Sequence, residues 1–214
     1  MTDVLIVPLI KSKLKDPTLS SNYRPIAIAT AVSKVFEQLL FNRLMNVLYS
    51  SDNQFGFKRH HSTEMCIFSL KETIHYYRAL NTPVFICFID IKSAFDRVSY
   101  FKVFFKLLAR GAPLYLMQLL QQWYTRQPPR IRWGGAVSAP FPMHNGIRQG
   151  SVVSPHLFNL YVDDLNVMLN RSRVGCHIAG VAANNFSYAD DLALVCPSAA
   201  ELNDLLQICE EFPS

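Results

Sequence analysis

The sequence NNFSYADDLALVC, residues Asn184–Cys196, joins a polar and aromatic stretch to an apolar, β-rich run through two adjacent acids, Asp190 and Asp191. This pattern predicts a strand, a tight turn and a second strand, with the acids on the turn. Carboxylates at a hairpin tip suit hard divalent cations, because phosphate oxygens can join the same coordination shell. The hairpin therefore indicates a phosphoryl-transfer site.

The composition is that of a folded protein with a sizeable core. Of 214 residues, 50% are hydrophobic and 17% are charged, enough for one large domain or two closely packed ones. A net charge of +5 is compatible with a polyanionic partner. Five cysteines without a C-x-x-C pair favour a reduced intracellular protein of the cytoplasm or nucleus, with no zinc site. We expect neither a signal peptide nor a membrane span.

Hydrophobic spacing predicts helices at residues 31–49, 63–78, 98–110, 113–125, 156–169 and 199–212. Strands are expected at residues 4–10 and 174–181, and residues 130–133 and 137–143 read as a hairpin. Residues 16–25 read as a polar turn region. The continuous apolar run Val84–Asp90 predicts a strand buried on both faces, with Asp90 at its carboxyl end.

The tetrapeptide Tyr188–Asp191 has a twin at Tyr161–Asp164. Around the twin, apolar residues recur at helical spacing, so Asp163 and Asp164 are expected on the solvated side of an amphipathic helix. We therefore assign the chemistry to Asp190.

Asp90 is the expected partner of Asp190, because adjacent strands bring their ends within coordination distance. Such a pair would hold two Mg²⁺ ions roughly 3.5–4 Å apart, which stabilise the attacking and leaving oxygens of an in-line displacement. The carbonyl of Ile91 would add a neutral oxygen ligand.

Five blocks, in order along nearly the whole chain, resemble motifs of reverse transcriptases from non-long-terminal-repeat (LINE-type) retrotransposons. Phe88–Asp96 (FIDIKSAFD) resembles motif A, Gly146–Pro155 (GIRQGSVVSP) resembles motif B, and Tyr188–Asp191 (YADD) resembles motif C. Upstream, the blocks that resemble finger motifs are Asn22–Ile26 (NYRPI) and Gln54–Phe57 (QFGF) with Ser62-Thr63.

The resemblance implies an α+β, right-hand polymerase fold with fingers and palm, the palm being a ferredoxin-like antiparallel sheet backed by helices. It divides the chain into fingers (1–82), a palm strand with motif A (83–97), an insertion between fingers and palm (98–145) and the remaining palm (146–214). The sequence given ends before the lysine-bearing motif D strand and the thumb of family members. The thumb is therefore expected to be absent, as in a fragment of a polyprotein.

The resemblance also implies catalytic roles. Asp90, Asp190 and Asp191 would be metal ligands, with the carbonyl of Ile91, for two Mg²⁺ ions or alternatively Mn²⁺. Tyr188 would support the end of the primer.

Further residues are implied at the incoming deoxynucleoside triphosphate. Phe95 would be a steric gate against a ribose 2′-OH, the group that distinguishes RNA from DNA. Gln149 and Gly150 would line the nucleotide. Positive charges that would neutralise its triphosphate are those of Lys58, Arg59 and Arg24.

The implied function is RNA-directed DNA polymerase, with an RNA template, a DNA primer and deoxynucleoside triphosphates as partners. An alternative from another class is a catalytically inactive RNA-binding remnant that lacks the thumb. A third is an intron-type maturase or another cellular relative of reverse transcriptases.

Overall fold

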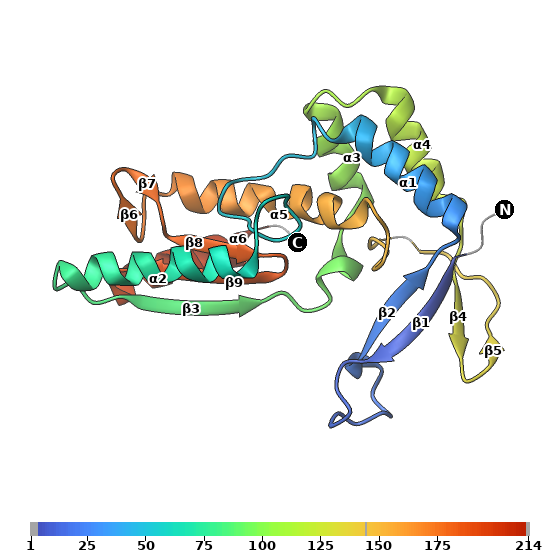
Figure 1. The fold of residues 1–214 in the computed structure, drawn as a ribbon, viewed down its shortest axis with the longest axis horizontal. Helices are drawn as coiled ribbons and strands as arrows, with labels where there is room; N and C mark the ends of the chain where they lie inside the picture. The colour runs from blue at the N-terminus through green and yellow to red at the C-terminus, as the bar shows by residue number, and fades with distance from the viewer. Residues whose placement is uncertain (1–3, 144, 213–214) are drawn as a thin grey trace. The chain divides into compact units, whose positions relative to one another are not determined.

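The computed structural model describes residues 4–143 and 145–212 (Figure 1). They form two compact units, each built from two separate stretches of the chain. The first unit comprises residues 4–48 and 95–157, and the second comprises residues 49–94 and 158–212. Among the described residues, no helix combines the length and the apolar character that crossing a membrane requires.

A four-stranded sheet with the strand order β2-β1-β4-β5 organises the first unit. β1 (Leu5–Ile10) pairs antiparallel with β2 (Tyr23–Ile28), and the two form the hairpin seen in blue in Figure 1. β4 (Arg130–Trp133) runs parallel to β1 and antiparallel to the short β5 (Ala136–Val137). β2 begins inside residues 16–25, which were predicted to be a polar turn region. The prediction is right for the loop but misses the start of the returning strand.

The described part of the first unit contains three complete α-helices: α1 (Ala31–Leu44), α3 (Tyr100–Ala109) and α4 (Leu114–Thr125). Thr30 caps α1 and Ser99 caps α3 by accepting backbone N–H groups of the first turn. The 3₁₀ turns η1 (Ser20–Asn22) and η2 (Ala94–Arg97) are also present, the latter where the chain passes from the second unit to the first.

An antiparallel sheet with the order β3-β9-β8 organises the second unit. Its strands are β3 (Phe85–Asp90), β8 (Asn185–Tyr188) and β9 (Asp191–Cys196). β8 and β9 form the predicted strand, turn and strand, so that prediction is confirmed. The strand expected at residues 174–181 is instead a small separate hairpin of β6 (His177–Ile178) and β7 (Val181–Ala182).

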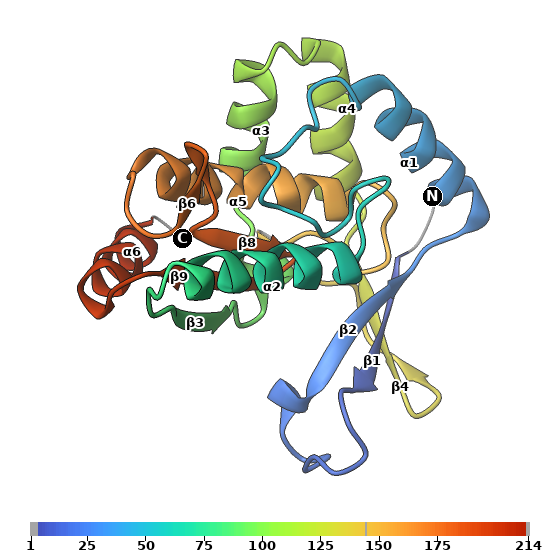
Figure 2. The same ribbon diagram turned by 60° about the vertical axis from the view of Figure 1, so that its left-hand side comes forward.

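Helices cover both faces of this sheet. They are α2 (Thr63–Ala79), α6 (Ala199–Glu211) and most of α5 (Ser154–Arg171), and Figure 2 shows α2 running along the sheet. Successive strand residues point to opposite faces, so β9 supplies two cores. Val195 packs in the cluster that includes Leu70 of α2, whereas Leu194 packs with Leu165 of α5 and Leu205 of α6.

β3 is an edge strand of the three-stranded sheet, and the prediction that it is buried on both faces is wrong. Phe88 is 74% exposed and Phe85 is 40% exposed, while Ile86 and Ile89 are half-buried. An edge strand has a neighbour on one side only, so fewer side chains cover it. A continuous apolar sequence does not distinguish such a strand from a central one.

Candidate active site

Three carboxylates gather at one end of the β3-β9-β8 sheet. Asp90 ends β3 and lies opposite Asp191, which begins β9. Tyr188 is the partner of Asp191 across β8 and β9, so only Ala189 and Asp190 form the turn. The N–H of Ile91 donates to the carbonyl of Asp190 at 3.3 Å, which ties the chain after β3 to the turn.

The acids repel one another. Burial raises the pKa of the Asp191 carboxyl, and the negative charges of Asp190 and Asp90 raise the same pKa further. A bound cation relieves this kind of repulsion. Within residues 4–143 and 145–212, no group of three or more His, Cys, Asp or Glu side chains is arranged as a ready metal site. The donors are nevertheless all oxygens, and this donor set fits Mg²⁺ or Mn²⁺ rather than zinc.

The turn that carries Asp190 has a strained backbone. Ala189 has a φ of 57°, in the left-handed region that favours glycine. The fully buried Gln54 holds both polar groups of this residue: its Oε1 accepts the Ala189 N–H at 3.0 Å and its Nε2 donates to the Ala189 carbonyl at 3.2 Å. Sequence reasoning assigned Gln54 to a finger motif and gave it no contact with the acids.

The segment that contains Gln54 runs beside β8. The N–H of Phe55 donates to the carbonyl of Ser187, and the N–H of Ser187 donates to the carbonyl of Asn53, both at 2.8 Å. A Cβ atom on Gly56 would overlap the backbone nitrogen of Ala189, so only glycine fits there without a shift.

Asp163 is buried, and the prediction that it is solvated is wrong. Its carboxylate accepts the N–H of Ser51 at 2.6 Å. Asp164 is exposed, as predicted. Part of the polar side of α5 therefore faces protein rather than water, since Asn159 also donates to the Gly56 carbonyl at 2.8 Å.

Lys58 is half-buried, and its ammonium donates to the carbonyl of Ser51 at 2.7 Å. Burial lowers the pKa of Lys58, and the negative charges of Asp52 and Asp163 oppose that shift. Arg59 is exposed beside it. The predicted contact of both side chains with a triphosphate stays a prediction.

In the first unit, Gln149 and Gly150 lie against β2. The N–H of Ala27 donates to the Gln149 carbonyl at 2.7 Å. Gly150 has a φ of 106°, and a Cβ atom there would lie 2.7 Å from the Ala27 carbonyl oxygen. This position therefore requires glycine. Arg24 is exposed on the same strand.

Phe95 belongs to the same run of backbone contacts in the first unit. Its carbonyl accepts the N–H of Ile147 at 2.8 Å, and the carbonyl of Val98 accepts the N–H of Gly146 at the same distance. The structure thus connects Phe95, through residues 146–149, to the strand that bears Arg24.

A buried glutamate that sequence reasoning missed supports the motif B loop. Glu37 of α1 is 2% exposed, and its carboxylate accepts three hydrogen bonds. The donors are the Trp123 ring nitrogen at 3.1 Å, the Ser151 hydroxyl at 2.9 Å and the Val152 N–H at 2.8 Å. The sequence did contain a signal for the buried position of Glu37, because it is an acidic residue among the apolar residues of a predicted helix.

Arg148 is also buried beneath this loop. Its guanidinium donates to the Gln127 side-chain oxygen at 3.0 Å and to the Trp123 carbonyl at 3.1 Å, and lies over the Tyr124 ring. Burial lowers the pKa of Arg148. The side chain therefore holds the loop against α4.

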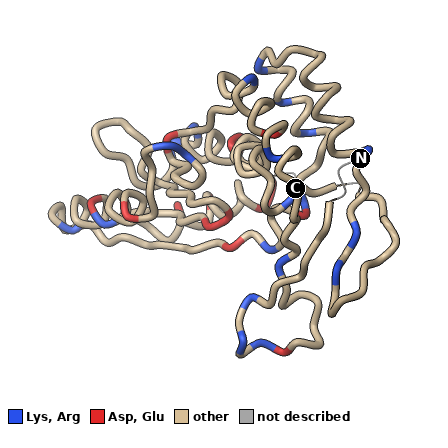
Figure 3. The backbone as a smooth tube through the Cα atoms, turned by 45° about the vertical axis from the view of Figure 1, so that its right-hand side comes forward, with Lys and Arg blue, Asp and Glu red and all other residues tan. Residues whose placement is uncertain are grey.

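Basic residues are concentrated on the loop between β1 and β2, which also carries Asp16, and continue into β2 (Figure 3). They are Lys11, Lys13, Lys15 and Arg24. Such a basic edge suits a polyanion.

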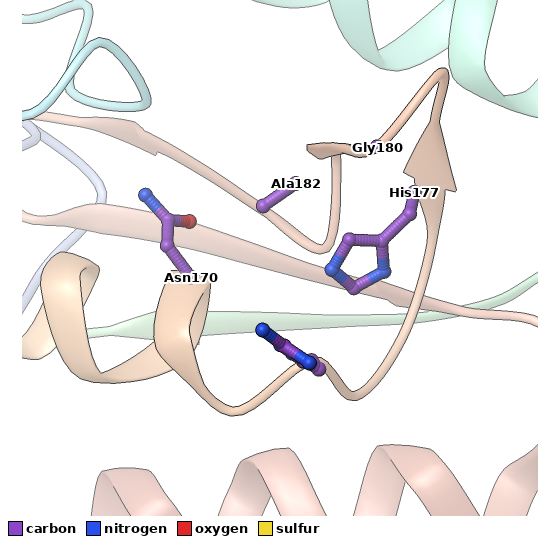
Figure 4. Close-up of a pocket in the computed structure, with 5 residues that line it drawn as sticks. Asn170, His177, Gly180 and Ala182 are labelled. Atoms are coloured by element: carbon purple, nitrogen blue, oxygen red, sulfur yellow. The ribbon is translucent and has the colours of Figure 1, made fainter.

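A separate hollow of about 440 Å³ lies in the second unit (Figure 4). Asn170, His177, Gly180 and Ala182 line it together with Arg173. Asn170 accepts a hydrogen bond from Asn185, at the opposite end of β8 from Tyr188. The hollow is therefore not part of the carboxylate cluster.

Comparison with known proteins gives a consistent result. The family model for reverse transcriptase (RNA-dependent DNA polymerase) matches residues 11–214. A probable RNA-directed DNA polymerase from transposon BS of Drosophila melanogaster is 32% identical over 181 residues, which cover 81% of this chain. The mobile element jockey polymerase of Drosophila funebris is 28% identical over 205 residues, 90% of this chain. The matched parts are 19% and 21% of those proteins.

Solved structures share the fold at low sequence identity. Telomerase from Candida albicans, in complex with a fragment of telomeric RNA, superposes with a TM-score of 0.66 at 12% identity. The match covers 98% of this chain and 40% of that one. Apo telomerase from Candida tropicalis gives a TM-score of 0.60 at 10% identity, over 89% of this chain and 44% of its own.

Proposed function

Since the chain belongs to the reverse transcriptase (RNA-dependent DNA polymerase) family, we propose that it is the polymerase part of a non-long-terminal-repeat retrotransposon protein. It transfers deoxynucleotides to the 3′-OH of a DNA primer on an RNA template. The observation that carries this function is the position of Asp90 opposite Asp191, with Asp190 in the adjoining turn.

Asp90, Asp190 and Asp191 would hold two divalent cations, with the carbonyl of Ile91 as a further oxygen donor. Once bound, Mg²⁺ supplies charge stabilisation to the attacking and leaving oxygens of nucleotidyl transfer. The protein contributes a fixed hairpin that keeps the carboxylates together at the end of a sheet. Tyr188, the partner of Asp191, would support the primer end.

The roles of the other predicted residues rest on the family. Phe95 would exclude a 2′-OH, and Gln149 and Gly150 would line the incoming nucleotide. Arg24, Lys58 and Arg59 would neutralise the triphosphate, because phosphates attract guanidinium and ammonium groups.

We also propose that the second unit is the palm, of ferredoxin-like type, because its antiparallel sheet carries the acids between helices. The β1–β2 hairpin, with its basic loop, would belong to the fingers. α2, predicted to lie in the fingers, is in the same unit as β3.

Primer extension on an RNA template tests the proposal. The chain with Asp190→Asn should lose Mg²⁺-dependent incorporation, whereas Asp164→Asn, the same change at the exposed acid of the twin tetrapeptide, should retain it. Equal incorporation by the wild-type chain and the Asp190 variant would overturn the assignment. Salt-dependent RNA binding without any extension would favour the alternative, an inactive RNA-binding remnant.

A further inference from the structure

The backbone on both sides of Ala189 is held by a single buried side chain. The Ala189 N–H belongs to the peptide group before this residue, and its carbonyl belongs to the peptide group after it. Gln54 bonds to both, at 3.0 and 3.2 Å. The two bonds together restrain φ and ψ of Ala189, and so the direction in which Asp190 leaves the turn.

A side-chain amide suits this pair of contacts, because it accepts at one atom and donates at the other. The N–H of Gly56 also donates to Oε1 of Gln54, at 2.9 Å, which fixes which end of the amide is the oxygen. Glutamate would place a second oxygen against the Ala189 carbonyl, and methionine would fill the space without either bond.

Gln54 is itself mounted rigidly. Its neighbours Asn53 and Phe55 exchange backbone hydrogen bonds with Ser187 of β8. α5 fixes the ends of the segment through Asp163, which binds Ser51, and Asn159, which binds Gly56. The Gln54 side chain therefore fixes the Asp190 turn relative to α5 and β8.

We propose that Gln54, assisted by the close contact of Gly56, is a positioning residue that sets the geometry of the Asp190 turn for cation binding. The effect on cation binding rests on the proposed function. The contact of Gln54 with Ala189 does not, because it is a feature of the second unit itself. Residues that orient metal ligands typically change metal affinity or activity by about 10- to 100-fold when they are replaced.

Two variants of the full chain test the inference by different routes. Gln54→Met keeps the volume and removes the hydrogen bonds, and Gly56→Ala forces the segment away from Ala189. Asn184→Ala is the matched control, because Asn184 is equally buried and its amide donates to the carbonyls of Leu169 and Val174 at the other end of β8.

The first measurement is amide hydrogen exchange, which needs no activity. Exchange at Ala189 should rise by about tenfold or more in both variants, with little change at Cys176, whose N–H bonds to Val195 in the distant part of the sheet. Asn184→Ala should leave Ala189 protected. Unchanged protection of Ala189 in both test variants would overturn the proposal.

The second measurement is the Mg²⁺ concentration for half-maximal primer extension, which a general loss of stability does not move. It should rise about 10- to 100-fold in Gln54→Met and stay constant in Asn184→Ala. An unchanged Mg²⁺ requirement in an active Gln54→Met enzyme would refute the positioning role. If the wild-type chain extends no primer, the proposed function fails, and the exchange at Ala189 still decides whether Gln54 holds the turn.

Discussion

The carboxylate of Asp163 accepts the backbone N–H of Ser51 at 2.6 Å, across 112 positions of the chain. Asp163 of the twin tetrapeptide is thus a structural anchor for the segment that reaches the turn of Asp190. Asp163→Ala leaves the half-buried N–H of Ser51 without this acceptor, so the free energy of unfolding should fall by about 1–3 kcal/mol. Urea denaturation measures it, and the exposed Asp164→Ala should change stability by only about 0.5 kcal/mol or less. Equal effects would contradict the anchoring role.

Asp90→Asn should separate activity from stability. Even residues that merely support metal ligands cost about 10- to 100-fold, so we expect loss of a proposed ligand to reduce extension by about 100-fold or more. Stability should be unchanged or slightly higher, because one of the charges that repel Asp191 is gone. Extension assays and thermal melts of the same preparation check both statements. Asp204→Asn, on the exposed side of α6, is the control. If the Asp90 variant unfolds at a lower temperature than the wild-type chain, its loss of activity is not evidence for a catalytic role.

Glu37→Ala should destabilise the first unit. Three donors, among them the Trp123 ring nitrogen, lose a charged acceptor, and we expect a cost of about 3 kcal/mol in unfolding free energy. Trp123 emission should shift at the same time, which can be read in a Trp133→Phe background. Glu37→Gln keeps one acceptor oxygen and should recover part of the loss. No difference between the two substitutions would argue against the hydrogen bonds.

The buried thiols make stability depend on alkaline pH. Burial raises the pKa of Cys196 to about 12 and those of Cys176 and Cys209 to about 11, from an ordinary value of 9.0. The unfolded chain therefore loses these protons first as the pH rises. The contribution of these protonated thiols to the free energy of unfolding is fully present below pH 9. It is lost as the pH rises from there towards 11–12.

Urea unfolding at about pH 8 and about pH 10 measures this loss. In Cys196→Ala the difference in stability between the two pH values should shrink. An identical difference in that variant would exclude the Cys196 thiol as a source.

Phe95→Ala should relax sugar selection, if Phe95 is the gate. Discrimination between deoxy- and ribonucleotides should fall by about tenfold or more, the scale on which a pocket senses a small group. Single-nucleotide incorporation kinetics with each substrate give the ratio. Phe101→Ala, a highly exposed aromatic of α3, is the control. If incorporation of deoxynucleotides and of ribonucleotides falls by the same factor, Phe95 has a structural role instead.

Local patterns were sufficient for the hairpin of β8 and β9, because alternating strand residues and a two-residue turn are written in adjacent positions. The cap of α6 is equally local, since Ser198 accepts the N–H of Glu201, three positions along the chain. The Glu201 side chain instead binds the N–H of Gly175, a partner that no local pattern contains.

Residues with partners distant in sequence were misread or missed. α1 buries Glu37 and exposes Val32, Val35 and Leu39, because the buried carboxylate serves the motif B loop more than 100 positions away. Asp163 was misread for the same reason. Amphipathic spacing assumes that polar side chains seek water, and it fails where they bind a buried backbone.

The interleaving of the two units along the chain bears on how the protein can be dissected. Residues 49–94 interrupt the first unit and residues 95–157 interrupt the second, so every unit is assembled from two pieces. No contiguous excerpt of the sequence contains one complete unit without part of the other. A protease cut between residues 94 and 95 would leave each unit dependent on both fragments, and expressing either unit alone requires a gene in which a linker replaces the segment that interrupts it.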